Sequence, residues 1–300
     1  MFDDADGDDV VERISPERAF ELLGHETRLR ILAELDDADD RVQFGDLRDR
    51  VGADDPGRFN YHLQELTDRF VRRSDEGYRI APAGRRVVGA VRSGTLTKEM
   101  AAEPTAVDGS CTICDADLVA EFDGDTVRIR CVDCEWILTE PAVPPSVLED
   151  WSIPAVPAAT GRWLRRLGVS AKLGLCPNCD GRLDVGLYRP GDPGSPDWFS
   201  GTLSPAVRVA TCRRCGHWWH TLAEIAVVTE PAVVAFHYEH GIDVFERPNW
   251  ELDWVELDLA SVESEDPLRV SIPITLDGET RTFVVDRDVS VVEVRDDPRP

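Results

Sequence analysis

Hydrophobic positions recur at helical spacing through most of the first hundred residues. Ser15-Pro16 is typical of a helix start, because serine caps the first turn and proline is tolerated at its first position. Asp55-Pro56 predicts the start of a fourth helix, which runs to about Arg69. The apolar positions of the three helices before it are Phe20, Leu22 and Leu23, then Leu29, Ile31, Leu32 and Leu35, then Phe44, Leu47 and Val51. The elements expected after it are two short strands at 71–74 and 78–80 around a turn, and a fifth helix at 83–91.

The second half of the chain changes from a helical pattern to one typical of strands. Residues 144–173 are predicted to be partly helical. Residues 250–295 alternate between polar and apolar, and Asp277-Gly278 indicates a hairpin turn among them. The same five residues occur at 139–143 and 229–233, which suggests an internal duplication.

The composition is strongly acidic and nearly free of lysine. The 300 residues include 58 Asp+Glu against 33 Lys+Arg, a formal net charge of -25, and the lysines are Lys98 and Lys172. High salt screens the self-repulsion of such a chain. We therefore interpret the composition as an adaptation to a very salty, halophilic cytoplasm. No apolar run is long enough to span a membrane, and the acidic start at 1–14 predicts a disordered tail rather than a signal peptide, so a cytoplasmic location is expected.

One stretch of the chain is basic. Residues 56–98 contain four acids against nine basic residues. The basic residues are Arg58, Arg69, Arg72, Arg73, Arg79, Arg85, Arg86, Arg92 and Lys98. The negative net charge of the whole chain therefore does not exclude a polyanionic partner at this stretch.

All eight cysteines occur in Cys-x-x-Cys pairs. The pairs are Cys111 and Cys114, Cys131 and Cys134, Cys176 and Cys179, and Cys212 and Cys215. Sixteen residues separate the first two pairs, a spacing that predicts a four-cysteine zinc ribbon with a hairpin around Asp123-Gly124. Thirty-two residues separate the other two, and a Gly/Pro-rich loop at 188–205 accounts for the excess. We expect two structural Zn²⁺ ions per chain.

Other uses of the cysteines are weighed against zinc. Disulfides are disfavoured in a cytosolic protein, and no thioredoxin-like setting accompanies the pairs. Iron bound by four cysteines, as in rubredoxin, remains open. His217 and His220 follow Cys215 and are expected to lie outside the complete sulfur shells. Complete shells favour a structural role over catalysis, and no nucleophile elbow, P-loop or dinucleotide motif is present, so an enzyme is not expected.

The fourth helix has the residues to read DNA. Phe59, Leu63 and Leu66 share one face and are expected to pack inward. The side chains predicted to contact DNA from this helix are Arg58, Asn60, Tyr61, His62 and Gln64. Since His62 borders the core on a helical wheel, a packed histidine is an equal alternative. The hairpin arginines Arg72, Arg73 and Arg79 are placed for phosphate contact.

Two segments carry a family resemblance. His25-Glu26-Thr27-Arg28-Leu29-Arg30-Ile31-Leu32 and Asn60-Tyr61-His62-Leu63-Gln64-Glu65-Leu66 resemble the winged helix-turn-helix of ArsR-type transcriptional regulators, over about residues 15–95. The resemblance implies DNA reading by the fourth helix and a homodimer. The chain has Arg69-Phe70-Val71 where the family often has Gly-Leu-Val, and the helix at 44–51 lacks the cysteine motif of metal-sensing members. The whole chain looks like a haloarchaeal regulator fused to zinc ribbons.

Together these observations predict an α+β multidomain protein. The expected parts are a tail at 1–14, a winged helix-turn-helix at 15–100, a first ribbon at 108–145, a partly helical linker at 146–173, a second ribbon at 174–247 and an antiparallel β region at 248–300. The predicted function is sequence-specific binding of double-stranded DNA as a transcriptional regulator, with possible protein contacts through the ribbons. The alternative is an adaptor of the transcription machinery that does not itself read DNA sequence.

Overall fold

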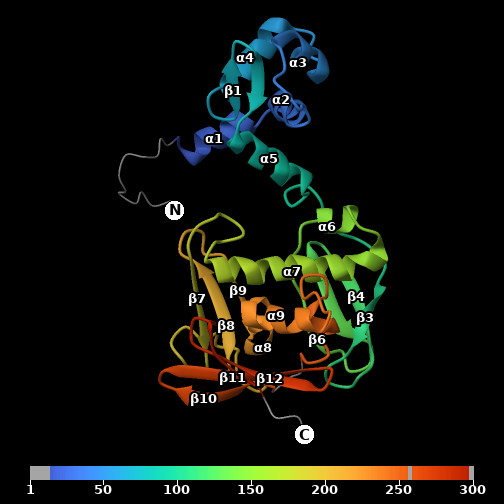
Figure 1. Ribbon diagram of the computed structural model, residues 1–300. Helices are drawn as coiled ribbons and strands as arrows, with labels where there is room; N and C mark the ends of the chain where they lie inside the picture. Colours follow the sequence, from blue (N-terminus) through green and yellow to red (C-terminus); the bar gives the residue numbers. More distant parts are fainter. Residues whose placement is uncertain (1–13, 256–258, 297–300) are drawn as a thin grey trace. The chain divides into compact units, whose positions relative to one another are not determined.

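In the computed structural model, which describes residues 14–255 and 259–296, the chain separates into two units between Lys98 and Glu99. Unit 1 comprises the residues up to Lys98, and unit 2 those from Glu99 onward. Both units combine helices with antiparallel sheets, which confirms the predicted α+β class (Figure 1). The tail predicted at 1–14 lies outside the described residues as far as position 13. None of the described helices is long and apolar enough to cross a membrane.

Unit 1 consists of helices packed with a two-stranded hairpin. Its elements are α1 (Pro16–Leu23), α2 (Glu26–Asp36), α3 (Phe44–Val51), α4 (Pro56–Leu66), β1 (Val71–Ser74), β2 (Gly77–Ile80) and α5 (Pro82–Arg92). The Ser15 hydroxyl accepts the N–H of Arg18 at 3.2 Å and caps α1. Gly52, with φ +70°, ends α3 in the left-handed conformation that glycine adopts at low cost.

The core of unit 1 is built from one face of each helix and from the hairpin. Its largest fully buried side chains are those of Ile31, Leu32, Leu47, Phe59, Leu63 and Leu66. The inward face predicted for the fourth helix is therefore confirmed.

Three details of the expected helices are wrong. The fourth helix ends at Leu66 rather than near Arg69, because Thr67 is extended and Asp68 has φ +73°. Phe20 and Leu29 were expected on apolar inner faces, but they are 75% and 38% exposed. These two apolar side chains are therefore exposed on the surface of unit 1 and are not part of its core.

The described residues of unit 2 form three antiparallel sheets in which successive strands are neighbours. The first two sheets are β3 (Thr105–Ser110), β4 (Asp117–Asp123), β5 (Thr126–Cys131) and β6 (Ile137–Thr139), and β7 (Leu183–Tyr188), β8 (Val207–Cys212) and β9 (Trp218–Leu222). The third sheet is β10 (Ser261–Glu265), β11 (Leu268–Leu276), β12 (Glu279–Val285) and β13 (Val291–Asp296). The helical elements are α6 (Ser146–Glu149), η1 (Ile153–Ala155), α7 (Val156–Leu173), α8 (Ala223–Ala226), η2 (Val227–Thr229), α9 (Pro231–Glu239) and η3 (Asn249–Glu251).

Helix α7 connects the first two sheets and packs against both. Trp163 contacts the hydrophobic cluster of the β3–β6 sheet and also that of the β7–β9 sheet. Leu167 and Ala171 are buried in the second of these clusters. The segment predicted to be a partly helical linker therefore has a structural role between the two cysteine-bearing sheets.

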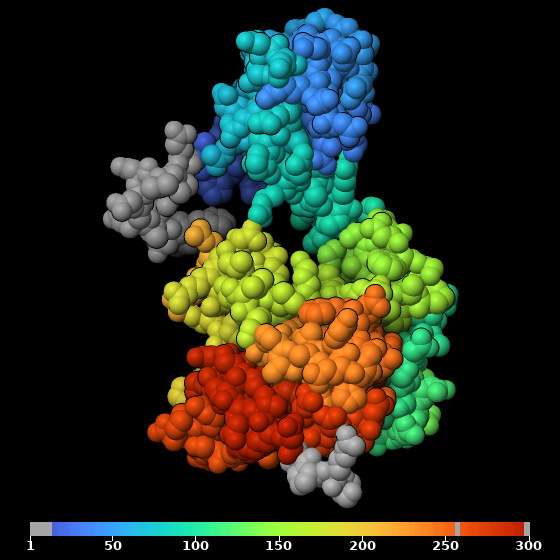
Figure 2. All heavy atoms as spheres, in the orientation of Figure 1, coloured from blue at the N-terminus to red at the C-terminus, as the bar shows by residue number. Residues whose placement is uncertain are grey.

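The third sheet encloses the largest core with α8 and α9. Phe236 of α9 lies 5.9 Å from Phe283 of β12 between ring centroids, and Arg281 of the same strand pairs with Glu239 at 2.9 Å. Figure 2 shows the residues around α9 (orange) lying against the C-terminal strands (red). The predicted antiparallel β region is confirmed from Ser261 onward.

Two expectations for unit 2 are corrected. Leu252 and Trp254 are buried, but they follow the short helix η3 and do not belong to a strand, so the alternating pattern misled at 250–255. The recurring five residues also differ in conformation. At 139–143 they leave β6 in an extended form, whereas at 229–233 they begin α9 at Pro231. The five recurring residues therefore do not themselves mark a structural repeat.

A buried histidine joins α9 to the segment after η3. His237 is fully buried, and its Nε2 accepts the indole N–H of Trp254 at 2.7 Å. Because an indole can only donate, the proton of the neutral ring lies on Nδ1, which donates to the carbonyl of Val233 at 2.8 Å. Burial lowers the pKa of His237 below its ordinary value. Protonation of Nε2 would place its new N–H against the indole N–H of Trp254, so that two donors would face each other.

We expect His237 to make unit 2 less stable in mild acid. When the folded pKa of a histidine is lowered, the unfolded chain binds more protons between that pKa and about 6.5. The free energy of unfolding should thus fall as pH drops below about 6.5. Urea unfolding from pH 8 to pH 5 should show a smaller decrease for His237→Gln than for the wild type, although the variant is less stable at pH 8. An equal decrease in the free energy of unfolding with falling pH in His237→Gln and the wild type would contradict this role.

Candidate metal centres and exposed basic surface

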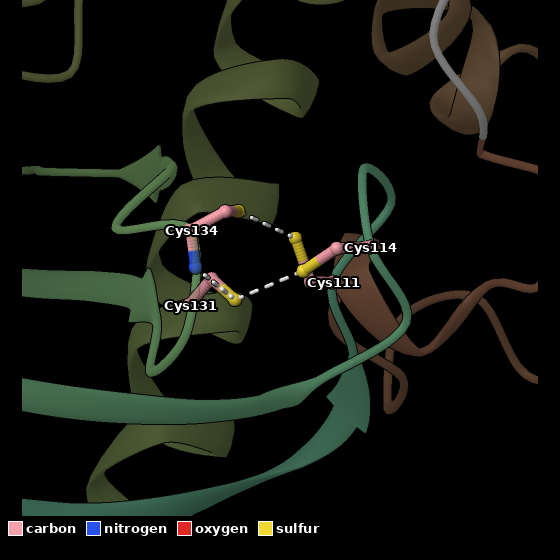
Figure 3. Close-up of side chains that lie close together, drawn as sticks. All are labelled: Cys111, Cys114, Cys131 and Cys134. Carbon is pink, nitrogen blue, oxygen red and sulfur yellow. Dashed lines mark hydrogen bonds between the residues drawn. The ribbon is translucent and has the colours of Figure 1, made fainter.

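The first four cysteines meet at one end of the β4–β5 hairpin. Cys111 and Cys114 flank the turn before β4, Cys131 is the last residue of β5, and Cys134 lies on the turn that follows. Figure 3 shows the sulfur atoms of the two turns facing one another, with 3.6 Å between the Sγ atoms of Cys111 and Cys134 and 3.4 Å between those of Cys114 and Cys131. The antiparallel register from Leu118↔Cys131 to Asp123↔Thr126 brings the turns together. The predicted hairpin and cysteine set are confirmed.

The second cluster repeats this arrangement in the β7–β9 sheet. The Sγ atoms of Cys176 and Cys215 are 3.8 Å apart, and those of Cys179 and Cys212 are 3.5 Å apart. The pairing of Leu183 with Cys212 aligns the two turns despite the long loop between β7 and β8. In each cluster, all four sulfur atoms lie within 4.8 Å of one another.

All four Cys-x-x-Cys turns share one backbone geometry. In each turn a backbone N–H points at the sulfur of the first cysteine from 3.4 Å, and the donors are Ile113, Asp133, Asn178 and Arg214. The residue after the second cysteine always has a left-handed φ, and these residues are Asp115, Glu135, Asp180 and Gly216. The cysteine spacing alone does not predict this recurring position. Its only signal is that Asp and Gly, which tolerate this conformation better than most residues, stand at three of the four sites.

The backbone donors make some of these thiols acidic. The N–H of Cys134, acting against burial, lowers the pKa of Cys131 to about 7, and the N–H of His217 with the Asn178 amide lowers that of Cys215 to about 6. The N–H of Ala116 also acts to lower the pKa of Cys114, but the neighbouring thiols and burial raise it to about 12. Four sulfurs this close cannot all ionise without a cation among them.

The geometry fits a tetrahedral thiolate-bound metal ion. A Zn–S bond of about 2.3 Å in a tetrahedron places the sulfur atoms about 3.8 Å apart. The observed pairs are close to this spacing and far from the about 2.05 Å of a disulfide. The two clusters thus have the donors and spacing to bind two metal ions, and zinc suits them. His217 and His220 belong to neither cluster; their rings instead contact Trp219 and Trp198.

The exposed face of α4 carries most of the predicted base-reading side chains. Arg58, Tyr61 and Gln64 are exposed, and Asn60 is half-buried. The Asp55 carboxylate caps the helix by accepting the N–H groups of Gly57 at 2.8 Å and Arg58 at 3.1 Å. This cap fixes the start of the helix and so the position of Arg58.

His62 does not belong to this exposed face. Its side chain is buried and its ring centroid lies 4.0 Å from that of His25. Burial, with the nearby His25 and Arg28, lowers its pKa. Its inclusion among the DNA contacts is wrong, because the alternative of a packed core histidine describes its position.

Replacing Asp55 with alanine should destabilise unit 1. The loss of an N-cap costs about 1 kcal/mol, within a range of roughly 0.5–2 kcal/mol. Urea unfolding followed by circular dichroism measures this change. Asp54→Ala is the matched control, since no hydrogen bond of the Asp54 carboxylate is found among the described residues. Equal stability of the two variants would contradict the capping role.

The β1–β2 hairpin exposes three arginines. Arg72 lies directly opposite Arg79, and the guanidinium of Arg73 lies over the Tyr78 ring at 5.8 Å. Among the residues that the structure describes, neither these arginines nor Arg58 forms an ion pair. Arg85 and Arg92 differ, because both pair with Asp36. Like charges directly opposite on a hairpin repel each other, so Arg72 and Arg79 form a locally unneutralised positive pair.

Comparison with family models covers both units. Residues 108–291 match a model described as a domain of unknown function, DUF7351. The chain belongs to the DUF7351 family. The DUF7351 match includes both cysteine clusters and α7, and a second model, the domain of unknown function DUF7347, matches residues 16–91, from α1 into α5. Searches of curated proteins and of solved structures gave no match.

Proposed function

We propose that the chain is a sequence-specific DNA-binding transcriptional regulator, with unit 1 as an ArsR-like winged helix-turn-helix. The observation that carries the proposal is the exposed face of α4, where Arg58, Tyr61 and Gln64 stand opposite the buried Phe59 and Leu63. Arginine and glutamine make paired hydrogen bonds to guanine and adenine edges in the major groove. A short helix that is capped at its start and buried on one side can present these side chains there.

The hairpin supplies the second part of a winged docking surface. In winged proteins the recognition helix enters the major groove while neighbouring segments contact the phosphate backbone. Among the described residues, Arg72, Arg73 and Arg79 have no carboxylate partner to compete with phosphate. This arrangement also accounts for the basic stretch at 56–98 in an acidic chain.

The two cysteine clusters serve this function as structural zinc sites. Complete four-sulfur shells leave no open position for a substrate, so the metal would stabilise small sheets that have limited cores. Phe20 on α1 is a candidate contact for a second copy of the chain, because a dimer would cover this exposed ring.

In a very salty cytoplasm, phosphate contacts would contribute less to DNA affinity than base contacts. Counterion release contributes little affinity in concentrated salt, so phosphate contacts alone would bind weakly. Base contacts from α4 would then decide where the protein binds.

The experiment is selection of duplexes from a random pool by the purified full chain at molar salt. We expect a shared sequence to be enriched over successive rounds. A second assay passes purified transcription proteins over the immobilised chain. Retention of these proteins, with no enrichment of any DNA sequence, would instead support the adaptor alternative.

A further inference from the structure

Helix α7 lies in a long stretch of the chain that has no acidic residues. Acids make up 58 of the 300 residues, yet none occurs between Asp150 and Asp180. The basic residues in this interval are Arg162, Arg165, Arg166 and Lys172, all on α7. The interval therefore forms a second basic stretch, in a different unit from the first.

The four basic side chains of α7 divide into two groups. Arg165 is buried and donates to the carbonyl of Arg247 at 3.1 Å, and Lys172 pairs with Glu230 at 2.6 Å. Arg162 and Arg166 are exposed, and neither forms an ion pair with any described residue. Since they are four positions apart on a helix, their side chains leave the same face about 6 Å apart along the axis.

Each exposed arginine lies over a tryptophan ring. The guanidinium of Arg162 is 5.3 Å from the centroid of Trp151, and that of Arg166 is 5.4 Å from the centroid of Trp163. Trp151 is itself 44% exposed. A guanidinium over an aromatic face is held by cation–π attraction while its N–H groups remain free to donate.

The inner face of α7 fixes the helix firmly in unit 2. A Cβ atom at Gly161 would lie 2.7 Å from the Pro248 side chain, and one at Gly168 would lie 3.3 Å from Thr229. Trp163 also packs on both cysteine-bearing sheets. Figure 1 shows α7 running along one side of unit 2 from the β3–β6 sheet to the β7–β9 sheet. The arginine–tryptophan pairs are therefore held on a rigid surface.

We propose that Arg162 and Arg166 of α7, with Trp151 and Trp163 beneath them, bind the phosphate backbone of double-stranded DNA. Charge complementarity selects this partner, because an acid-free helix with two exposed guanidinium groups suits a polyanion although the net charge of the whole chain is -25. The proposal rests on the proposed function, and it adds a sequence-independent contact from unit 2 to the sequence-reading contact from α4.

The test compares full-length variants on two duplexes, the selected sequence and a scrambled one, over a range of salt. Arg162→Ala with Arg166→Ala should weaken binding to both duplexes by roughly tenfold to a hundredfold and reduce the slope of log affinity against log salt by about 2. Arg162→Lys with Arg166→Lys should keep the slope and lose part of the affinity. The control for total charge is Arg128→Ala with Arg295→Ala, two arginines that form ion pairs elsewhere in unit 2.

Wild-type affinity of the alanine pair for both duplexes, or an equal loss in the control, would overturn the proposal. The two claims fail separately. Enrichment of a sequence with no effect of the alanine pair would overturn only the α7 contact. Binding without sequence preference that the alanine pair weakens would support the α7 contact and overturn sequence reading by α4. Absence of any duplex binding would overturn both.

Discussion

Replacing Cys131 with serine is expected to reduce the bound zinc from two ions per chain to one and to unfold the β3–β6 sheet. Cys131 is fully buried, and its sulfur accepts the N–H groups of Asp133 and Cys134. A serine hydroxyl is not a thiolate at neutral pH and leaves the shell incomplete. Structural zinc contributes about 10–16 kcal/mol of apparent binding free energy in small domains, which exceeds the stability of most single domains.

Native mass spectrometry measures the zinc content. Limited proteolysis of the variant beside the zinc-loaded wild-type chain measures the local unfolding. We expect new cleavage in the β3–β6 region while the β7–β9 cluster keeps its ion. His217→Ala is the control, because the His217 ring belongs to neither cysteine cluster. Two retained ions in Cys131→Ser, or a lost ion in His217→Ala, would show that the sulfur shells are assigned incorrectly. The same spectra distinguish zinc from iron by mass.

The second large effect is expected from Arg58→Ala combined with Gln64→Ala. Each paired contact to a base contributes about 1–3 kcal/mol of discrimination, so losing two should reduce the preference for the selected sequence by roughly thirtyfold or more. Binding to a scrambled duplex should change less, because the hairpin arginines remain. Competition binding at fixed salt measures both affinities.

Arg48→Ala with Arg50→Ala provides a control on α3 that removes two positive charges, against one in the α4 variant. Arg48 pairs with its neighbour Asp49, and both residues are outside the face that we assign to base reading. A preserved preference in the α4 double variant would remove α4 from the reading role. An equal loss in both double variants would indicate a general loss of positive charge instead.

The sequence predicted those parts of the fold that short-range rules determine. Ser15 and Asp55 cap the helices that they were expected to start, and the Cys-x-x-Cys spacing predicted both sulfur clusters. Alternation predicted the strands after Ser261, where side chains face a core on one side. Each of these features depends on residues that are close in sequence or on a repeated period.

Features set by tertiary contacts were not predictable in this way. Trp254 is buried in the core beside the third sheet without belonging to a strand, and His237, distant in sequence, accepts its indole N–H. His62 lies on the border of a helical wheel, and only the contact with His25 places it in the core. The pairing of Arg162 and Arg166 with tryptophans likewise required the folded chain, although the absence of acids from 151–179 was visible in the sequence.

The most direct test of the central claim is a map of DNA occupancy across the genome of the native cell. The wild-type chain should occupy discrete sites that share one sequence, and this sequence should match the one selected in vitro. The chain with Arg58→Ala and Gln64→Ala, at equal abundance, should lose these sites. Diffuse occupancy without a shared sequence, or an identical map for the variant, would contradict the claim that α4 reads DNA.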